Sequence, residues 1–137
     1  MPALVLAAVT GLLLTATTAD PVVGKWQTVS VTRGDTPDPG LKGAVREHTA
    51  DGKYKITPAA GSKSPAVEGT YKLDPTKSPA HIDMKPAAGR YKDRTLQGIY
   101  KVEGDVLTIA FAEPGQPRPA DFEPRPDRVV AVHKKGK

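Results

Sequence analysis

Few side chains in this chain could do chemistry, and the three histidines come first. His81 and Asp83 stand two apart in an alternating segment, so their side chains would share one face of a strand. His48 and its neighbour Glu47 would point to opposite sides. His133 stands alone, and no paired spacing of the kind that metal sites use is present. We therefore interpret the histidines as surface residues and predict no metal site.

Nucleophilic catalysis would need a serine, threonine or cysteine beside a base and an oriented carboxylate. Cysteine is absent, and the serines lie at a polar strand position (Ser30) or in loops rich in Pro and Gly (Ser62, Ser64 and Ser78). The sequence has no Gly-x-Ser-x-Gly elbow and no glycine-rich phosphate loop. Spacing alone does not test paired carboxylates for glycoside hydrolysis. We predict that the chain is not an enzyme, with no catalytic residue and no cofactor.

The charge distribution does not favour nucleic acid as a partner. The 137 residues include 20 basic and 15 acidic side chains, a net charge of +5. Lys134, Lys135 and Lys137 supply three of these positive charges at the C-terminal end, so the rest of the chain is nearly balanced. The aromatic residues fall mostly in strand-like segments, and the sequence has no extended basic stripe interleaved with them. Stacking platforms for nucleic acid would need several of them exposed on one basic face.

The first segment of the chain has the pattern of an export signal. Residues 3–14 are apolar apart from Thr10 and Gly11, and small residues follow as far as Ala19. Such a run is too short to span a bilayer as a helix but suits the central part of a signal peptide. The usual basic residues before the run are missing, which leaves a start further upstream, an uncleaved anchor and a buried segment as alternatives. We predict a signal peptide over 1–19, no integral membrane span once it is removed, and a secreted or periplasmic location.

The remaining chain, 20–137, is predicted to form one all-β domain. It contains 12 of the chain's 13 Gly and 13 of its 14 Pro, which exclude long helices. Short segments rich in Val, Ile, Tyr, Thr and Phe alternate in polarity, as in Tyr71 and Leu73 on one face with Thr70 and Lys72 on the other. One dry and one wet face is typical of antiparallel strands. The predicted strands are 23–32, 44–50, 53–58, 66–73, 80–85, 95–102, 105–112 and 128–134.

Turn signals suggest how these strands connect. Asp51-Gly52 and Glu103-Gly104 predict tight hairpins, because glycine adopts the positive φ that such turns need. Residues 113–127 contain five Pro, so we predict an ordered loop folded over one end of the sheet and anchored by Phe122. Short antiparallel strands form a barrel or a sandwich. Sequential hairpins favour an eight-stranded up-and-down barrel, whose interior side chains can fill or which can hold one small ligand.

Gly24-Lys25-Trp26, at the head of the first predicted strand, resembles the lipocalin signature. The segments GKWQTVSV, DGKYKIT, EGTYKLDPTKSPAHIDM, LQGIYKVEGDVLTIAFAEPGQPRP and VVAVHKK, in this order, are similar to an uncharacterised family of secreted lipocalin-like domains of planctomycete bacteria. The resemblance covers residues 22–135. It implies a calycin barrel closed by Gly24 and Trp26, with Trp26 packed on a basic side chain of the last strand, either Arg128 or Lys134. It implies no catalytic residue.

The predicted strand 44–50 departs from that pattern. It places Val45, Glu47 and Thr49 where the resemblance implies large apolar side chains facing the core. A core-facing carboxylate is costly unless it is paired or hydrated. Either the register of this strand shifts, or the interior of the barrel is partly polar.

Two functions are compatible with this reading. The first is a binding module that holds a small apolar molecule inside the barrel, driven by burial of apolar surface. The alternative is a structural or protein-interaction domain whose barrel is filled by the same side chains and takes no ligand; its protein partner is unknown. In both cases the barrel wall is predicted to consist of Tyr54, Tyr71, Met84, Tyr100, Ile109 and Phe111.

Overall fold

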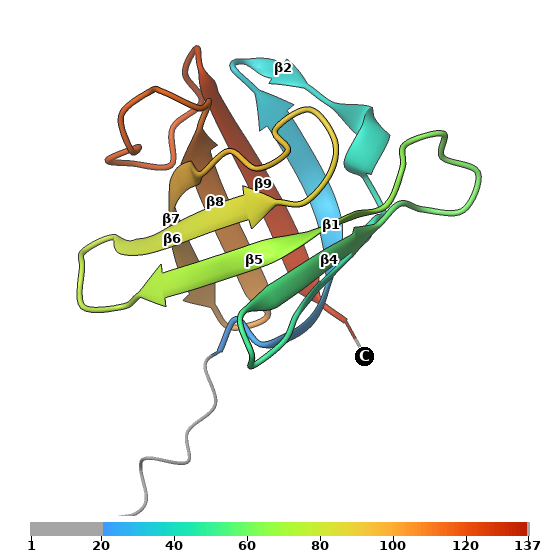
Figure 1. Cartoon of the computed structure of the whole chain (residues 1–137), viewed down its shortest axis with the longest axis horizontal. Helices are drawn as coiled ribbons and strands as arrows, with labels where there is room; N and C mark the ends of the chain where they lie inside the picture. The colour runs from blue at the N-terminus through green and yellow to red at the C-terminus, as the bar shows by residue number, and fades with distance from the viewer. Residues whose placement is uncertain (1–20, 137) are drawn as a thin grey trace, which may run out of the picture.

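The alternating segments of the sequence form antiparallel strands in the computed structural model, which describes residues 21–136 (Figure 1). All eight predicted segments are strands, with ends that match to within one or two residues. Two short elements, β2 and η3, were not expected from the sequence. In chain order the elements are β1 (Gly24–Arg33), β2 (Thr36–Pro37), the 3-10 turn η3 (Pro39–Leu41), β3 (Val45–His48), β4 (Lys53–Thr57), β5 (Val67–Asp74), β6 (Ala80–Pro86), β7 (Leu96–Glu103), β8 (Val106–Ala112) and β9 (Arg128–Lys135).

The strands pair in chain order and close on themselves. Each long strand lies antiparallel to the next, and β9 returns to pair with β1, for example at Trp26 with Lys135. A bulge between Thr28 and Ser30 interrupts the alternation, so that Thr28 and Val31 are both buried. The predicted fold class is therefore confirmed: the protein is all-β, with a closed eight-stranded antiparallel up-and-down barrel of the lipocalin-like kind, extended by the two-residue β2.

The predicted signal peptide over 1–19 lies outside the residues that the structure describes. Within residues 21–136, no helix is long and apolar enough to cross a membrane.

Trp26 fills one end of the barrel. Its side chain is 1 % exposed, and its indole N–H donates a hydrogen bond to the carbonyl of Val22 at 2.9 Å. The ammonium group of Lys135 lies 4.7 Å from the centre of the indole ring. Gly24 has a φ of +132°, and a Cβ at this position would lie 2.7 Å from the Lys135 Nζ. Only glycine therefore fits where the chain enters the barrel.

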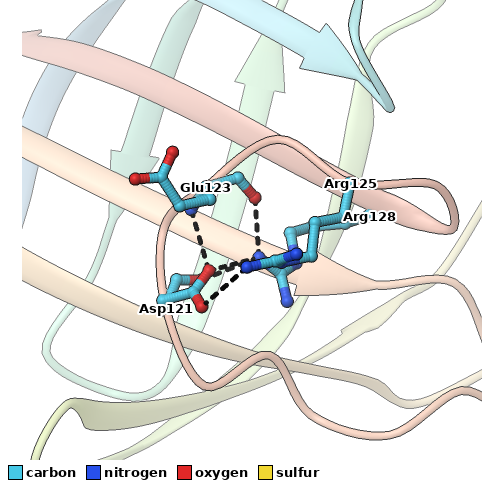
Figure 2. A network of polar contacts seen from close by, with 4 residues as sticks. All are labelled: Asp121, Glu123, Arg125 and Arg128. Carbon is cyan, nitrogen blue, oxygen red and sulfur yellow. Dashed lines mark hydrogen bonds and ion pairs between the residues drawn. The ribbon is translucent and has the colours of Figure 1, made fainter.

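The sequence predicts Arg128 or Lys134 as the basic partner of this tryptophan, and the structure shows that this prediction is wrong. Both lysines are exposed, but Lys135 is the one that pairs with Trp26 across the strands and places its ammonium group over the indole, whereas Lys134 lies on the opposite face of β9. Arg128 lies at the other end of β9. There its Nη1 donates to the carboxylate of Asp121 at 2.7 Å and to the carbonyl of Glu123 at 2.6 Å, and so fastens the preceding loop (Figure 2).

That loop, residues 113–127, connects β8 to β9 and folds against the outside of the barrel, at the end away from the start of β1 (Figure 1). Phe122 packs on an outer apolar cluster formed by Ile99, Ala110 and Val130, which come from three neighbouring strands. The predicted role of Phe122 as the anchor of an ordered loop is confirmed.

Strand β3 presents its even-numbered residues to the interior. Arg46 is 6 % exposed and His48 is 1 % exposed, whereas Val45 is 40 % exposed. Of the two alternatives for this strand, the shift in register is correct, because Glu47 does not face the core. The other alternative, a partly polar interior, also holds, because the shifted register buries Arg46 and His48 instead of Glu47.

Glycines inside two strands lie opposite aromatic residues, and at Gly69 the absence of a Cβ lets the ring of Tyr54 pack across the strand. Tyr54 pairs with Gly69 on β5, and Phe111 pairs with Gly98 on β7. A Cβ on Gly69 would lie 2.8 Å from the Tyr54 ring and 2.5 Å from the carbonyl oxygen of Lys85. Gly69 and Gly98 thus each lie opposite an aromatic residue of the neighbouring strand.

One predicted hairpin turn forms one residue later than expected. Glu103 pairs with Val106, so the turn residues are Gly104 and Asp105, and of these two only the glycine has a positive φ. Between β3 and β4, residues 49–52 form a longer link than the predicted two-residue turn.

Candidate functional site

A cavity of about 170 Å³ opens at the end of the barrel opposite Trp26. Its rim includes residues 88–91, between β6 and β7, and Leu41 of η3. Larger hollows lie on the outer surface, where mostly exposed polar residues line them. The inner walls of the cavity are mainly apolar, formed by Ile56, Val67, Met84, Pro86, Leu96 and Phe111.

The predicted wall residues divide into two groups. Tyr54, Met84 and Phe111 line the cavity. The other three do not line it, and instead pack in the core between the cavity and the closed end. That half of the barrel is filled by side chains, so the available space is confined to the half near the rim. The three core residues are Tyr71, Tyr100 and Ile109.

Arg46 is the buried cation of this site. Its Nε donates to Nε2 of His48 at 3.2 Å, and its Nη2 donates to the sulfur of Met84 at 2.8 Å. The guanidinium carbon lies 4.9 Å from the centre of the Tyr54 ring. Burial lowers the pKa of Arg46 to about 10, so the side chain stays protonated at neutral pH.

Two histidines lie buried below the cavity. His48 is 1 % exposed and His133 is 2 % exposed, and a hydrogen bond of 3.0 Å joins Nδ1 of His133 to the hydroxyl of Thr28. The prediction that these are surface residues is wrong, because the register of β3 and β9 turns both inward. His81, the third histidine, is partly exposed on β6.

The environment keeps both buried imidazoles neutral. Burial, with the nearby charge of Arg46, lowers the pKa of His48 to about 2 and that of His133 to about 3. Because Nε2 of His48 accepts a hydrogen bond from Arg46, its proton must sit on Nδ1, which has no acceptor among the described residues. Within residues 21–136, no group of three or more acidic or histidine side chains is arranged to hold a metal ion.

Sequence reasoning missed Arg46 as an interior residue, although a signal was present. In segment 44–50, one alternation would bury Val45 and Glu47, and the other would bury Arg46 and His48. Either register places a charged or titratable side chain inside the barrel. The pairing of β3 with β1 shows which register forms, because it places Arg46 opposite the inward-facing Trp26.

Comparison of the chain with protein-family models, with curated proteins and with solved structures finds no match.

Proposed function

We propose that this domain is an extracytoplasmic binding module that holds a small, largely apolar molecule in the open half of its barrel. The observation that carries the proposal is the apolar cavity opposite Trp26. Its walls come from strands β4 to β8, which the closed barrel holds at fixed positions. Burial of apolar surface against these walls would supply the affinity, at about 25 cal/mol per Å² removed from water.

The volume of the cavity sets the size of the ligand. Sites for drug-sized molecules start near ~300 Å³, which is more than the 170 Å³ found here. An engineered apolar cavity of about 150 Å³ binds benzene. A molecule about the size of one aromatic ring therefore fits the cavity.

The competing function is a structural or protein-interaction domain with a filled barrel. The half near Trp26 favours it, because Tyr71, Tyr100 and Ile109 pack there against the core. Binding of a ring-sized molecule in the other half would distinguish the two functions.

Toluene is a suitable probe, because it is neutral and ring-sized. We expect it to raise the thermal midpoint of unfolding in a saturable way, with binding followed by ligand-observed NMR. Val67→Phe, which adds volume to the cavity wall, should abolish binding. Val45→Phe makes the same change on the outer face and should leave binding intact. If toluene and other ring-sized molecules leave the midpoint unchanged, the filled-barrel function is correct.

The location outside the cytoplasm, and membership of the secreted planctomycete family, are part of the same proposal. The apolar run of residues 3–14 and the small residues up to Ala19 support export. N-terminal sequencing of the protein expressed from the full chain tests it. We expect an exported form that begins at Asp20, and a protein that retains its first residues in the cytoplasm would contradict the proposal.

A further inference from the structure

Within residues 21–136, Arg46 differs from the other arginines that are not exposed in having no carboxylate partner. Arg33 pairs with Asp38, Arg118 of the Pro-rich loop pairs with Asp83, and Arg128 of β9 pairs with Asp121. Among residues 21–136, no carboxylate forms an ion pair with Arg46, although it is the most deeply buried charge in the barrel. Its acceptors are an imidazole nitrogen and a thioether, both neutral, and the thioether is a weak acceptor.

A buried charge without a counter-ion is costly, and proteins keep one where it meets a charge of opposite sign. Arg46 also lines the cavity. Its guanidinium contacts His48 and Tyr54. On β3, His48 is the next inward-facing residue after Arg46 toward the closed end, and on β4 Tyr54 holds the same position relative to Ile56. The cation is thus at the floor of the cavity, and the apolar walls rise above it to the rim.

We propose that the ligand of this cavity is a small organic monocarboxylate whose carboxylate pairs with Arg46 while its apolar body fills the space below the rim. The inference rests on the proposed binding function and specifies the chemical class of the ligand. A carboxylate matches the planar fork of a guanidinium. The volume admits a body about the size of one ring, such as that of benzoate.

Arg33 also lines the cavity but is a weaker candidate for this role. It sits at the rim end of β1, and its Nε already donates to the carboxylate of Asp38 at 2.7 Å. A ligand anion there would compete with Asp38, whereas at Arg46 it would meet a cation with no anion beside it.

The test compares benzoate with benzamide, which has nearly the same shape but no charge, by calorimetric titration of the full mature domain at neutral pH. We expect benzoate to bind on the order of 30-fold more tightly, because hydrogen bonds to charged groups are stronger than those between neutral groups. In Arg46→Met this preference should disappear, with benzamide affinity nearly unchanged. Arg33→Met is the matched control at the rim and should keep the preference.

Arg46→Met is expected to fold, because replacing a buried unpaired charge by an apolar side chain of similar length removes a desolvation cost. A higher unfolding midpoint of the ligand-free variant would show this directly. Acetate is the further probe, since it carries the charge without the ring. We expect acetate to bind much more weakly than benzoate.

The outcomes separate the two proposals. Equal binding of benzoate and benzamide, or a benzoate preference that survives in Arg46→Met, overturns the carboxylate inference and leaves apolar binding standing. Acetate that binds as tightly as benzoate also overturns it, because the site would then select any small anion. If benzoate, benzamide and toluene all fail to bind, the binding function and the inference fail together.

Discussion

At the scale of single residues, the charge of Arg46 acts on its neighbours as well as on a ligand. It lies beside His48, and it adds to the burial that lowers the pKa of His48 and of His133. The histidines were expected on the surface, because sequence spacing cannot tell which face of a strand is buried. The folded protein therefore holds two imidazoles that the unfolded chain would protonate readily.

These pKa values predict a loss of stability in mild acid. Unfolded histidines bind protons below about pH 6.5, whereas His48 and His133 stay neutral in the fold down to pH values of about 2 and 3. The free energy of unfolding should therefore fall as the pH drops below 6.5, by up to about 1.4 kcal/mol per pH unit for each histidine. Urea unfolding between about pH 7 and pH 4 measures the slope.

Variants of single histidines test whether His48 and His133 cause this dependence of stability on pH. His48→Gln or His133→Gln should remove about half of it, and His81→Gln controls for loss of a histidine outside the interior. The lowered pKa values of Asp38 and Asp121, next to their arginine partners, affect stability only below about pH 3.8. A slope that both interior variants leave unchanged would contradict the burial of the histidines.

At the scale of elements, the strands were predictable and their inner faces only partly so. Runs rich in Val, Ile, Tyr, Thr and Phe between turn signals predicted the eight long strands. Alternation in several of them predicted their inner faces, because a sheet with one wet face imposes a period of two. Alternation did not identify the inner face of β3, because polar residues occur in both possible registers. The position of the turn after β7 was predicted one residue too early, because Gly104 could be either its first or its second residue. The size and position of the cavity could not be predicted from the sequence, because they depend on how far the side chains of several strands extend into the barrel.

Gly69 tests the packing of an aromatic ring across a strand. Gly69→Ala should destabilise the protein by about 1–3 kcal/mol, because the added Cβ overlaps the Lys85 carbonyl and the Tyr54 ring. Thr70→Ala, at the next position on β5 but on the exposed face, should change stability by less than about 0.5 kcal/mol. Equilibrium urea unfolding compares the two. Equal effects would show that the contact across Gly69 does not matter.

Trp26 tests the closed end of the barrel. Trp26→Ala leaves a cavity beneath Val22 and Lys135 and should cost about 3–5 kcal/mol of unfolding free energy. Lys134→Ala, on the outward face of β9, is the control and should be nearly neutral. A loss below about 1 kcal/mol for Trp26→Ala would mean that this end does not depend on the indole.

At the scale of the whole molecule, the strand pairings differ in length around the barrel. Strand β9 has seven paired residues with β8 and seven with β1, whereas β4 has four with β3 and four with β5. The weakly paired side also carries Arg46, Tyr54 and Ile56 of the cavity lining. Local opening should therefore begin at β3 and β4.

Native-state hydrogen exchange measures this difference. We expect amides of β3 and β4 to exchange through openings of lower free energy than amides of β8 and β9, which should exchange only on global unfolding. Benzoate should slow exchange on the weaker side, because bound ligand stabilises the closed state. Uniform protection around the barrel would show that the paired lengths do not govern opening.

The return of β9 to β1 also governs how the protein behaves at high concentration. Open sheets present rows of unpaired backbone groups on which a second chain can add a strand, and this is a common route to fibrous aggregates. In the part of the chain that the structure describes, β2 is the strand with a partner on one side only; it has two residues, and one of them, Pro37, has no N–H to offer. A chain without cysteine cannot be protected by disulfides, and ring closure of the sheet gives it a different protection against self-association.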